Sequence, residues 1–274
     1  MESETLERER LTARRVLDGA ATQLRVVHAL ILRETKTRYG EHKMGFLWAF
    51  VEPLALVAIM AVVFSGMRSD SPGGMPLVPF MITGFVPFMI FRDTMGQMIG
   101  AISQNRSLLA FPQVTTFDVV LARGLLEIAV LLVVLAVLLG LASVFGFEVR
   151  VESPLKVLGA CLTLALMGAG AGFLFASLSP VVPAVRQFVT AFLGRPLFFG
   201  SGLFYTADTL PATVREWLLY NPLLHLIELV RSACFHEFES AHASWDYALT
   251  WAVLTLALGL LVHQALSRRA VVGL

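Results

Sequence analysis

Six hydrophobic segments, each about as long as a membrane-spanning helix, constrain this chain more than any other feature. A bilayer core about 30 Å thick is crossed by roughly 20 mostly apolar residues in helical form. Hydrophobic residues make up 57% of the 274 positions and charged residues only 15%, whereas an ordinary soluble domain has about 25% charged residues. The sequence therefore predicts an all-α membrane protein with six transmembrane helices. The spans are expected at 47–67, 77–101, 119–147, 155–178, 188–206 and 247–266.

Two of these segments are irregular. The second carries two prolines and two charged residues, namely Pro79, Pro87, Arg92 and Asp93. We expect it to be kinked, with its polar half facing protein or water, because unpaired backbone and charge are costly in lipid. The fifth is short and has the sequence Gly-Arg-Pro at 194–196 near its middle. It is expected to be either a bent helix or a re-entrant pair.

Basic residues gather near the amino terminus, where nine of the 21 Lys and Arg fall within the first 46 residues. Cytoplasmic flanks of membrane spans carry an excess of Lys and Arg. With the amino terminus inside, the same side also collects Arg106, Arg123 and Arg186. Six spans then leave both termini in the cytoplasm, and no cleavable signal peptide is expected. We therefore expect a cytoplasmic segment at 1–46, a transmembrane domain at 47–267 and a cytoplasmic tail at 268–274.

Residues 22–43 have the pattern of a basic amphipathic helix. Leu24, Val27, Leu30 and Ile31 recur at helical spacing among arginines and a lysine. Such a helix lies in the cytoplasmic headgroup layer. The outer connection at 207–244 is too long for a bare loop and is expected to be partly helical.

Charged residues inside or beside the spans are candidates for a transport path. They are Glu52, Arg92, Asp93, Glu127 and Arg195. An ionised group at the membrane centre costs about 2.5 to 3.5 kcal/mol on insertion scales, so it normally faces a bundle interior or a watery path. The competing interpretation is structural: Arg92 and Asp93 pair with nearby charges, and Glu52 satisfies backbone groups beside Pro53.

Aromatic residues form a second candidate path. Trp48 lies in the first span, and Phe85, Phe88 and Phe91 follow one another along the second. Sugars stack on aromatic faces, so such a series could carry a glycan. Lipid-facing and interfacial aromatic residues are at least as common, and both interpretations remain open.

Several kinds of chemistry lack the residues that they need. The chain has no G-x-x-x-x-G-K-[ST] phosphate loop and no G-x-S-x-G elbow, so any ATP would be hydrolysed by another chain. The outer connection contains His225, Glu228, His236, Glu237 and His242, but without a recognised metal-binding spacing. The two cysteines form no disulfide framework. We expect no catalytic residue, metal site or cofactor in this chain.

Two stretches resemble the permease subunits of type-2 ABC exporters. They are LRETKTRYGEHKMGFLWAFVEPL at 32–54 and RPLFFGSGLFYTADTLPATVREWLLYNPLLHLIELVR at 195–231. The likeness is nearest to the capsular polysaccharide export permease of the KpsM type. It extends from about residue 26 to the last span, and the RYG…GFLW…EPL block carries most of it.

The resemblance implies a homodimer with six spans per subunit, an interface helix before the first span and a re-entrant hairpin between the fifth and sixth. The turn of that hairpin would fall at Tyr220, Asn221 and Pro222. A pair of partner ATPase subunits would bind ATP and Mg and dock from the cytoplasm. The cargo would be a lipid-linked polysaccharide, passed from the bacterial inner membrane to periplasmic and outer-membrane export proteins. No nucleic-acid partner is implied.

The resemblance also assigns the ATPase contact to the interface helix and to the inner loop at 103–116. The candidate docking residues are Arg33, Lys36, Arg38, Asn105, Arg106 and Leu108. Two alternatives remain. One is a permease of the same fold that exports O-antigen, teichoic acid or a drug. The other is a membrane enzyme acting on lipid-linked sugars, for which His225 and Glu228 would be the candidate groups.

Overall fold

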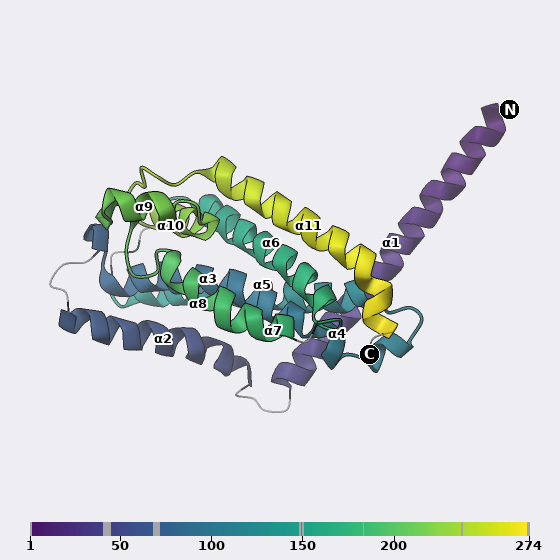
Figure 1. The fold of residues 1–274 in the computed structure, drawn as a ribbon, viewed down its shortest axis with the longest axis horizontal. Coiled ribbons are helices and arrows are strands. Elements are labelled where there is room, and N and C mark those ends of the chain that lie inside the picture. Colours follow the sequence, from purple (N-terminus) through teal and green to yellow (C-terminus); the bar gives the residue numbers. More distant parts are fainter. Residues whose placement is uncertain are drawn as a thin grey trace.

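The computed structural model describes residues 2–40, 45–67, 72–147, 149, 151–182, 184–236 and 238–272. Within these ranges every regular element is a helix, and there is no β-strand. Figure 1 shows a bundle of long helices with α1 projecting from one end. We call this the α1 end, and the opposite end, which carries α9 and α10, the α10 end.

Five of the described helices are long and apolar enough to cross a membrane. They coincide with five of the six predicted spans, and their ends lie within a few residues of the predicted ones, except that the last helix continues to Val272. They are α2 (Gly45–Met67), α3 (Leu77–Ile99), α5 (Thr116–Val144), α6 (Pro154–Leu178) and α11 (Trp245–Val272). Shorter elements connect them, namely η1 (Pro72–Gly74), α4 (Ala101–Gln104), η2 (Leu108–Ala110) and η4 (Ala207–Thr209).

The predicted fifth span is not one regular helix. Its place is taken by α7 (Ala184–Phe188), a π-helical turn η3 (Val189–Leu193) and α8 (Gly194–Gly200). Pro196 has no N–H to donate, and the turn before it widens to the π pattern. The chain then turns at Gly202, whose φ of 75° suits glycine. None of these elements is among the five candidate spans, so a sixth span stays a prediction.

The helix at the amino terminus is longer than predicted. α1 runs from Glu2 to Tyr39 as one helix of 38 residues, whereas residues 41–43 of the predicted segment lie outside the described ranges. It packs mainly against α5, and Val27 and Leu30 are buried there while Leu24 is 73% exposed. The apolar side chains of α1 therefore divide between the protein and its surroundings.

Helix α6 is the centre of the bundle, with its most extensive contacts to α11 and α3. Glycines allow the backbones to touch: a Cβ on Gly170 would lie 2.5 Å from the Leu256 nitrogen, and one on Gly259 would lie 2.1 Å from the Gly170 oxygen. A Cβ on Gly168 would lie 2.7 Å from the Phe91 oxygen of α3. Small residues at crossings allow this close packing of membrane helices.

At the α10 end, α9 (Ala212–Leu218) and α10 (Pro222–Cys234) form a helical pair. Asn221 caps α10 by accepting a hydrogen bond from the Leu223 nitrogen at 3.0 Å, and its amide donates to the Gly200 oxygen at 3.0 Å. Asparagine at the cap and proline at the first helical position are strong helix starters. The predicted turn at residues 220–222 is confirmed, while entry of this pair into the membrane stays a prediction.

Candidate transport path and coupling surface

Three of the predicted path residues form a charged group, which we call the α3 charge cluster: Glu52, Arg92 and Asp93. The Arg92 guanidinium donates to both Asp93 oxygens, at 2.6 and 3.1 Å, and to Glu52 at 3.3 Å across the α2–α3 contact. The side chains are 32% exposed at Arg92, 21% at Asp93 and 64% at Glu52. The paired interpretation of Arg92 and Asp93 is thus what the structure shows in this conformation.

The cluster carries two carboxylates and one guanidinium. An anionic cargo that approached Arg92 would have to compete with Asp93 and Glu52 for the same donors. Because a salt bridge at a partly exposed site contributes only about 1 kcal/mol or less, the Glu52 contact is easily exchanged. The simplest reaction at this cluster is therefore replacement of the Glu52 carboxylate by another anion at the Arg92 guanidinium.

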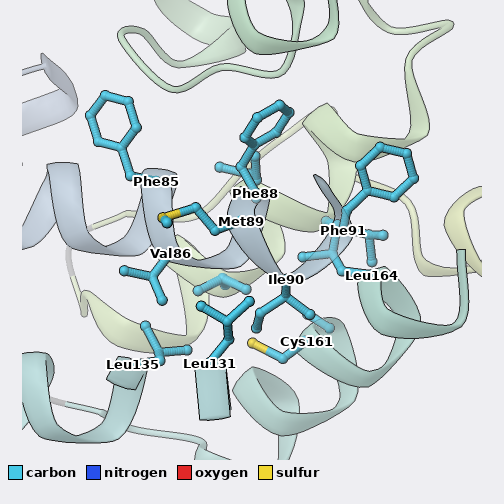
Figure 2. Close-up of a cluster of buried hydrophobic side chains, with 14 of the residues drawn as sticks. Phe85, Val86, Phe88, Met89, Ile90, Phe91, Leu131, Leu135, Cys161 and Leu164 are labelled. Atoms are coloured by element: carbon cyan, nitrogen blue, oxygen red, sulfur yellow. The ribbon is translucent and has the colours of Figure 1, made fainter. Parts of the chain in front are cut away.

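The predicted aromatic residues are buried within the single chain. Phe85 and Phe88 are 0% and 1% exposed and Phe91 is 6% exposed. Figure 2 shows the Phe85 and Phe88 rings on one side of α3, with Leu131, Leu135 and Cys161 on the other. The rings of Phe85 and Phe88 both lie within 6 Å of the Phe198 ring of α8. In this conformation they pack α8 onto α3 and do not line an open track.

Trp48 is separate from both groups. It is 70% exposed on α2, and only 11% of the residues between Leu47 and Phe64 of that helix are buried. The rest of the described chain therefore leaves this apolar helix mostly uncovered. The structure therefore brings together Glu52, Arg92 and Asp93, and separately Phe85 and Phe88, but it leaves Trp48 apart.

The predicted docking residues belong to α1 and to the connection between α3 and α5, which meet at the Arg33–Asn105 contact. Arg33 of α1 donates to the Asn105 side-chain oxygen at 2.9 Å, and Asn105 is 2% exposed and donates to the Ala101 oxygen at 3.1 Å. Leu108 packs against the small core around Val27 and Leu30. Lys36 and Arg106 are exposed. Helix α1 and the α3–α5 connection are thus held together by this hydrogen bond and this apolar contact.

Two further ion pairs fasten α1 to α5. Glu34 and Arg38 stand four residues apart on α1 and meet Arg123 and Glu127, also four apart on α5. Arg123 contacts Glu34 at 3.2 Å, and Arg38 contacts Glu127. Burial lowers the pKa of Arg38, but the hydrogen bond and charge of Glu127 outweigh burial and raise it. Movement of α1 must therefore carry α5 with it unless these pairs break.

Glu127 is recognisable from the sequence as a charge inside a span, but neither its partner Arg38 nor the role of Glu34 is. Opposite charges at a spacing of four on two helices were the available signal. The pairing itself depends on the register between segments 89 positions apart.

Glu127→Gln is expected to lower the stability of α1 docking by about 1 to 3 kcal/mol, because a buried acceptor loses the charge that binds Arg38. We expect faster trypsin cleavage within α1 and a lower thermal midpoint in detergent. Glu216→Gln, an exposed carboxylate on α9, is the matched control and should change neither. Equal cleavage rates in wild type and Glu127→Gln would contradict the prediction.

At the α10 end, three polar residues on one face of α10 hold the surrounding loops. His225 contacts the Leu219 oxygen at 2.8 Å and accepts from the Ser244 nitrogen at 3.0 Å. Glu228 accepts from the Ala207 nitrogen at 2.5 Å and from the Ser240 hydroxyl. The residues that a membrane enzyme would need are therefore bound to loop backbone and to a serine hydroxyl.

Arg231, the third of these residues, is fully buried. Its guanidinium donates to the Gly202, Tyr205 and Leu203 oxygens at 2.6, 3.1 and 3.3 Å and lies 3.8 Å from the centre of the Phe80 ring. Over the described part of the chain, no group of three or more His, Cys, Asp or Glu side chains could hold a metal ion. Glu237 of the predicted outer group lies outside the described residues.

Comparisons with known proteins agree with this architecture. Residues 25–235 match the family model described as ABC-2 type transporter. The chain is 29% identical to the polysialic acid transport protein KpsM of Escherichia coli over 246 residues, which are 90% of this chain and 95% of that protein. It is 32% identical over 254 residues to the capsule polysaccharide export inner-membrane protein CtrC of Neisseria meningitidis serogroup A, covering 92% and 95% of the two chains.

A third relative, like CtrC, is named as a capsule polysaccharide export inner-membrane protein. The chain is 30% identical over 254 residues to the capsule polysaccharide export inner-membrane protein BexB of Haemophilus influenzae, covering 90% of this chain and 93% of that protein. The family match begins within α1 and continues through α10. The chain belongs to the ABC-2 type transporter family.

Proposed function

We propose that this chain is the permease subunit of an ATP-driven exporter that moves lipid-linked capsular polysaccharide across the bacterial inner membrane. One observation carries the proposal: relatives named for capsule polysaccharide export match 90% or more of the chain, with nearly their full lengths covered. The five candidate spans suit a membrane subunit. The chain itself is not an enzyme in this proposal, and ATP and Mg bind to a partner ATPase.

The proposed topology has six spans, with the α7–α8 region as the fifth. Both termini are cytoplasmic, with segments at 1–46 and 268–274 flanking a transmembrane domain at 47–267. Support comes from Arg106, which follows α3, from Arg186, which follows α6, and from Arg123, which lies in the first turns of α5. Basic residues are in excess on the cytoplasmic side of membrane spans. α1 is then the amphipathic interface helix, and the α9–α10 pair is the re-entrant hairpin on the outer side.

The proposed assembly is a homodimer of this chain with two ATPase subunits docked on α1 and the 103–116 connection. Arg33, Lys36, Arg38, Asn105, Arg106 and Leu108 are the proposed docking residues. Nucleotide binding by the ATPases would bias a two-state equilibrium between closed and open permeases. The α1–α5 ion pairs support transmission of that movement into the bundle. The emerging chain passes to periplasmic and outer-membrane export proteins.

The cargo path is proposed to lie between the two permeases, with Trp48, Glu52, Phe85, Phe88, Phe91, Arg92 and Asp93 as candidate contacts. Since Phe85, Phe88 and Phe91 are buried in this conformation, the open state would have to separate α8 from α3. Arg92 would then exchange Glu52 for the anionic polymer.

Arg92→Glu is expected to reduce surface capsule at least about tenfold, because it replaces the exchangeable donor by a third carboxylate that repels an anionic chain. The measurement is capsule content of cells with the chromosomal gene replaced, with dimer assembly checked by cross-linking. Lys156→Glu, which reverses an exposed lysine at the start of α6, is the control. Normal export by Arg92→Glu with intact dimers would remove Arg92 from the path.

Deletion of the gene tests the function as a whole. We expect loss of surface capsule, normal drug sensitivity and intracellular accumulation of the polysaccharide, with complementation by the wild-type chain. Unchanged capsule in the deletion strain would contradict the proposal. Altered drug sensitivity with normal capsule would instead favour a drug exporter of the same fold.

An O-antigen cargo is the second candidate, because a relative named as an O-antigen export permease, RfbA of Myxococcus xanthus, is 32% identical over 81 residues. That match covers only 30% of each chain, so it supports the shared architecture more than the cargo. The same deletion strain distinguishes the two, since loss of the lipopolysaccharide O-chain with normal capsule would favour this alternative.

A further inference from the structure

A polar pocket lies at the α1 end, between α1, the end of α3, α4 and the first turns of α5. We call it the α1–α5 pocket. Its volume is about 250 Å³, and all but one of the side chains lining it are polar. The polar ones are Glu34, Thr37, Arg38, Gln97, Gln104 and Arg123. None of these residues belongs to the α3 charge cluster.

The pocket favours an anion. Two of the lining groups are guanidinium groups and one is a carboxylate, while Glu127, the partner of Arg38, lies outside the lining. A guanidinium has five N–H donors, so one carboxylate partner does not exhaust it. The amide groups of Gln97 and Gln104 add neutral donors that can bind a negatively charged oxygen.

The positions of these groups are fixed by packing. Arg123 is held by Glu34 at 3.2 and 3.4 Å and by the Gln104 side-chain oxygen at 2.6 Å. Gln104 reaches this position because residue 100 is glycine: a Cβ there would lie 2.6 Å from the Gln104 side-chain nitrogen. Arg123 and Glu34 are 13% and 14% exposed, so this part of the pocket wall is preorganised, whereas Thr37, Arg38 and Gln104 face solvent.

Size and position select the ligand. Pockets for drug-sized molecules have about 300 to 1,000 Å³, so about 250 Å³ suits a small anionic group such as a single phosphate. Under the proposed topology, on which this inference rests, α1 lies at the cytoplasmic membrane surface, where phosphate groups of anionic lipids are concentrated. Arginine forks bind phosphate bidentately.

We propose that the α1–α5 pocket binds a phosphate group, either the phosphodiester of an anionic lipid headgroup, including that of a lipid-linked cargo, or free phosphate. A bound phosphate bridges Arg38 of α1 and Arg123 of α5. It thereby strengthens the contact of the interface helix with the first turns of α5. The site would sense the headgroup at the level of the membrane surface, separately from the cargo path.

Alkylation of Thr37→Cys in the purified chain tests this site directly. Thr37 is exposed and lines the pocket, whereas the native Cys161 and Cys234 are both 0% exposed. We expect phosphatidylglycerol to slow maleimide labelling of Thr37→Cys about tenfold, and phosphatidylcholine, whose headgroup has no net charge, to slow it much less. Protection by phosphatidylglycerol alone assigns a lipid headgroup, and protection by inorganic phosphate as well assigns a site open to free phosphate.

The matched variants keep the ion pairs intact. Thr37→Cys/Gln97→Glu places a carboxylate in the pocket and should lose the protection, whereas Thr37→Cys/Gln187→Glu, with the same charge change at an exposed residue of α7, should keep it. Equal protection by phosphatidylglycerol in all three variants would overturn the proposal, as would equal protection by phosphatidylcholine. The assay needs no ATPase, cargo or capsule. A negative labelling result would therefore leave the proposed export function untouched, and a protein that did not export polysaccharide could still show phosphate binding in this assay.

Discussion

Gly170→Ala is expected to destabilise the folded chain by about 3 kcal/mol. The added Cβ would lie 2.5 Å from the Leu256 nitrogen and 2.6 Å from the Thr255 oxygen, both of which are backbone atoms of α11. Backbone cannot turn aside as a flexible side chain can, so α6 and α11 would have to separate. We expect a lower thermal midpoint in detergent and a smaller monodisperse fraction on size exclusion.

A matched glycine on α5 gives the control. A Cβ on Gly140 would meet nothing within 4 Å, and alanine in a helix is favoured over glycine by about 0.8 to 1 kcal/mol. Gly140→Ala should therefore leave the midpoint unchanged or raise it. Gly259→Ala should behave like Gly170→Ala, because its Cβ would lie 2.1 Å from the Gly170 oxygen. If Gly170→Ala and Gly140→Ala had the same midpoint, the close α6–α11 crossing would be wrong.

The main spans could be predicted from the sequence because apolar runs of about 20 residues leave a chain few alternatives. The helices α2 and α6 begin within two residues of the predicted ends. The α7–α8 region is also predicted as a span from its apolar residues, yet its hydrogen-bond pattern is set by Pro196 and Gly202. Hydropathy does not register such local backbone chemistry, which is why the fifth segment could not be assigned to one form.

The charged part of the site was more predictable than the aromatic part. Glu52, Arg92 and Asp93 stood out because ionised groups inside spans are rare and need partners. Phe85 and Phe88 gave no such signal, since phenylalanine suits lipid, a glycan track and a protein core equally well. Only the placement of Phe198 against α3 decides that they are buried here.

The ion pairs between α1 and α5 could not be predicted from the sequence for a different reason. The contacts of Arg38 with Glu127 and of Arg123 with Glu34 depend on the register of α1 along α5. No local pattern fixes that register. His225, Glu228 and Arg231 do share a helix face at a spacing of three, and from the sequence alone the first two are candidates for a metal or catalytic group. Their loop contacts show a structural role.

Arg231→Met is expected to destabilise the chain by about 3 to 5 kcal/mol, because three buried carbonyl groups lose their donor. Methionine fills a similar apolar volume, so lost packing is not the cause of the effect. The Gly202, Leu203 and Tyr205 oxygens belong to the turn that follows α8, and without Arg231 this turn should detach from α10. A lower thermal midpoint and new protease cleavage in the 201–206 segment are the expected measurements.

The shape of the guanidinium, more than its charge, is what this turn requires. Arg231→Lys keeps a cation over the Phe80 ring, where a cation–π contact contributes about 2 kcal/mol when desolvated. A single ammonium cannot donate to three separate carbonyls in the geometry of a fork. We therefore expect Arg231→Lys to fall between wild type and Arg231→Met, and Arg195→Met, at an exposed arginine of α8, to leave the midpoint unchanged. If Arg231→Lys matched wild type, charge alone would hold the turn; if Arg231→Met matched it, Arg231 would have no structural role.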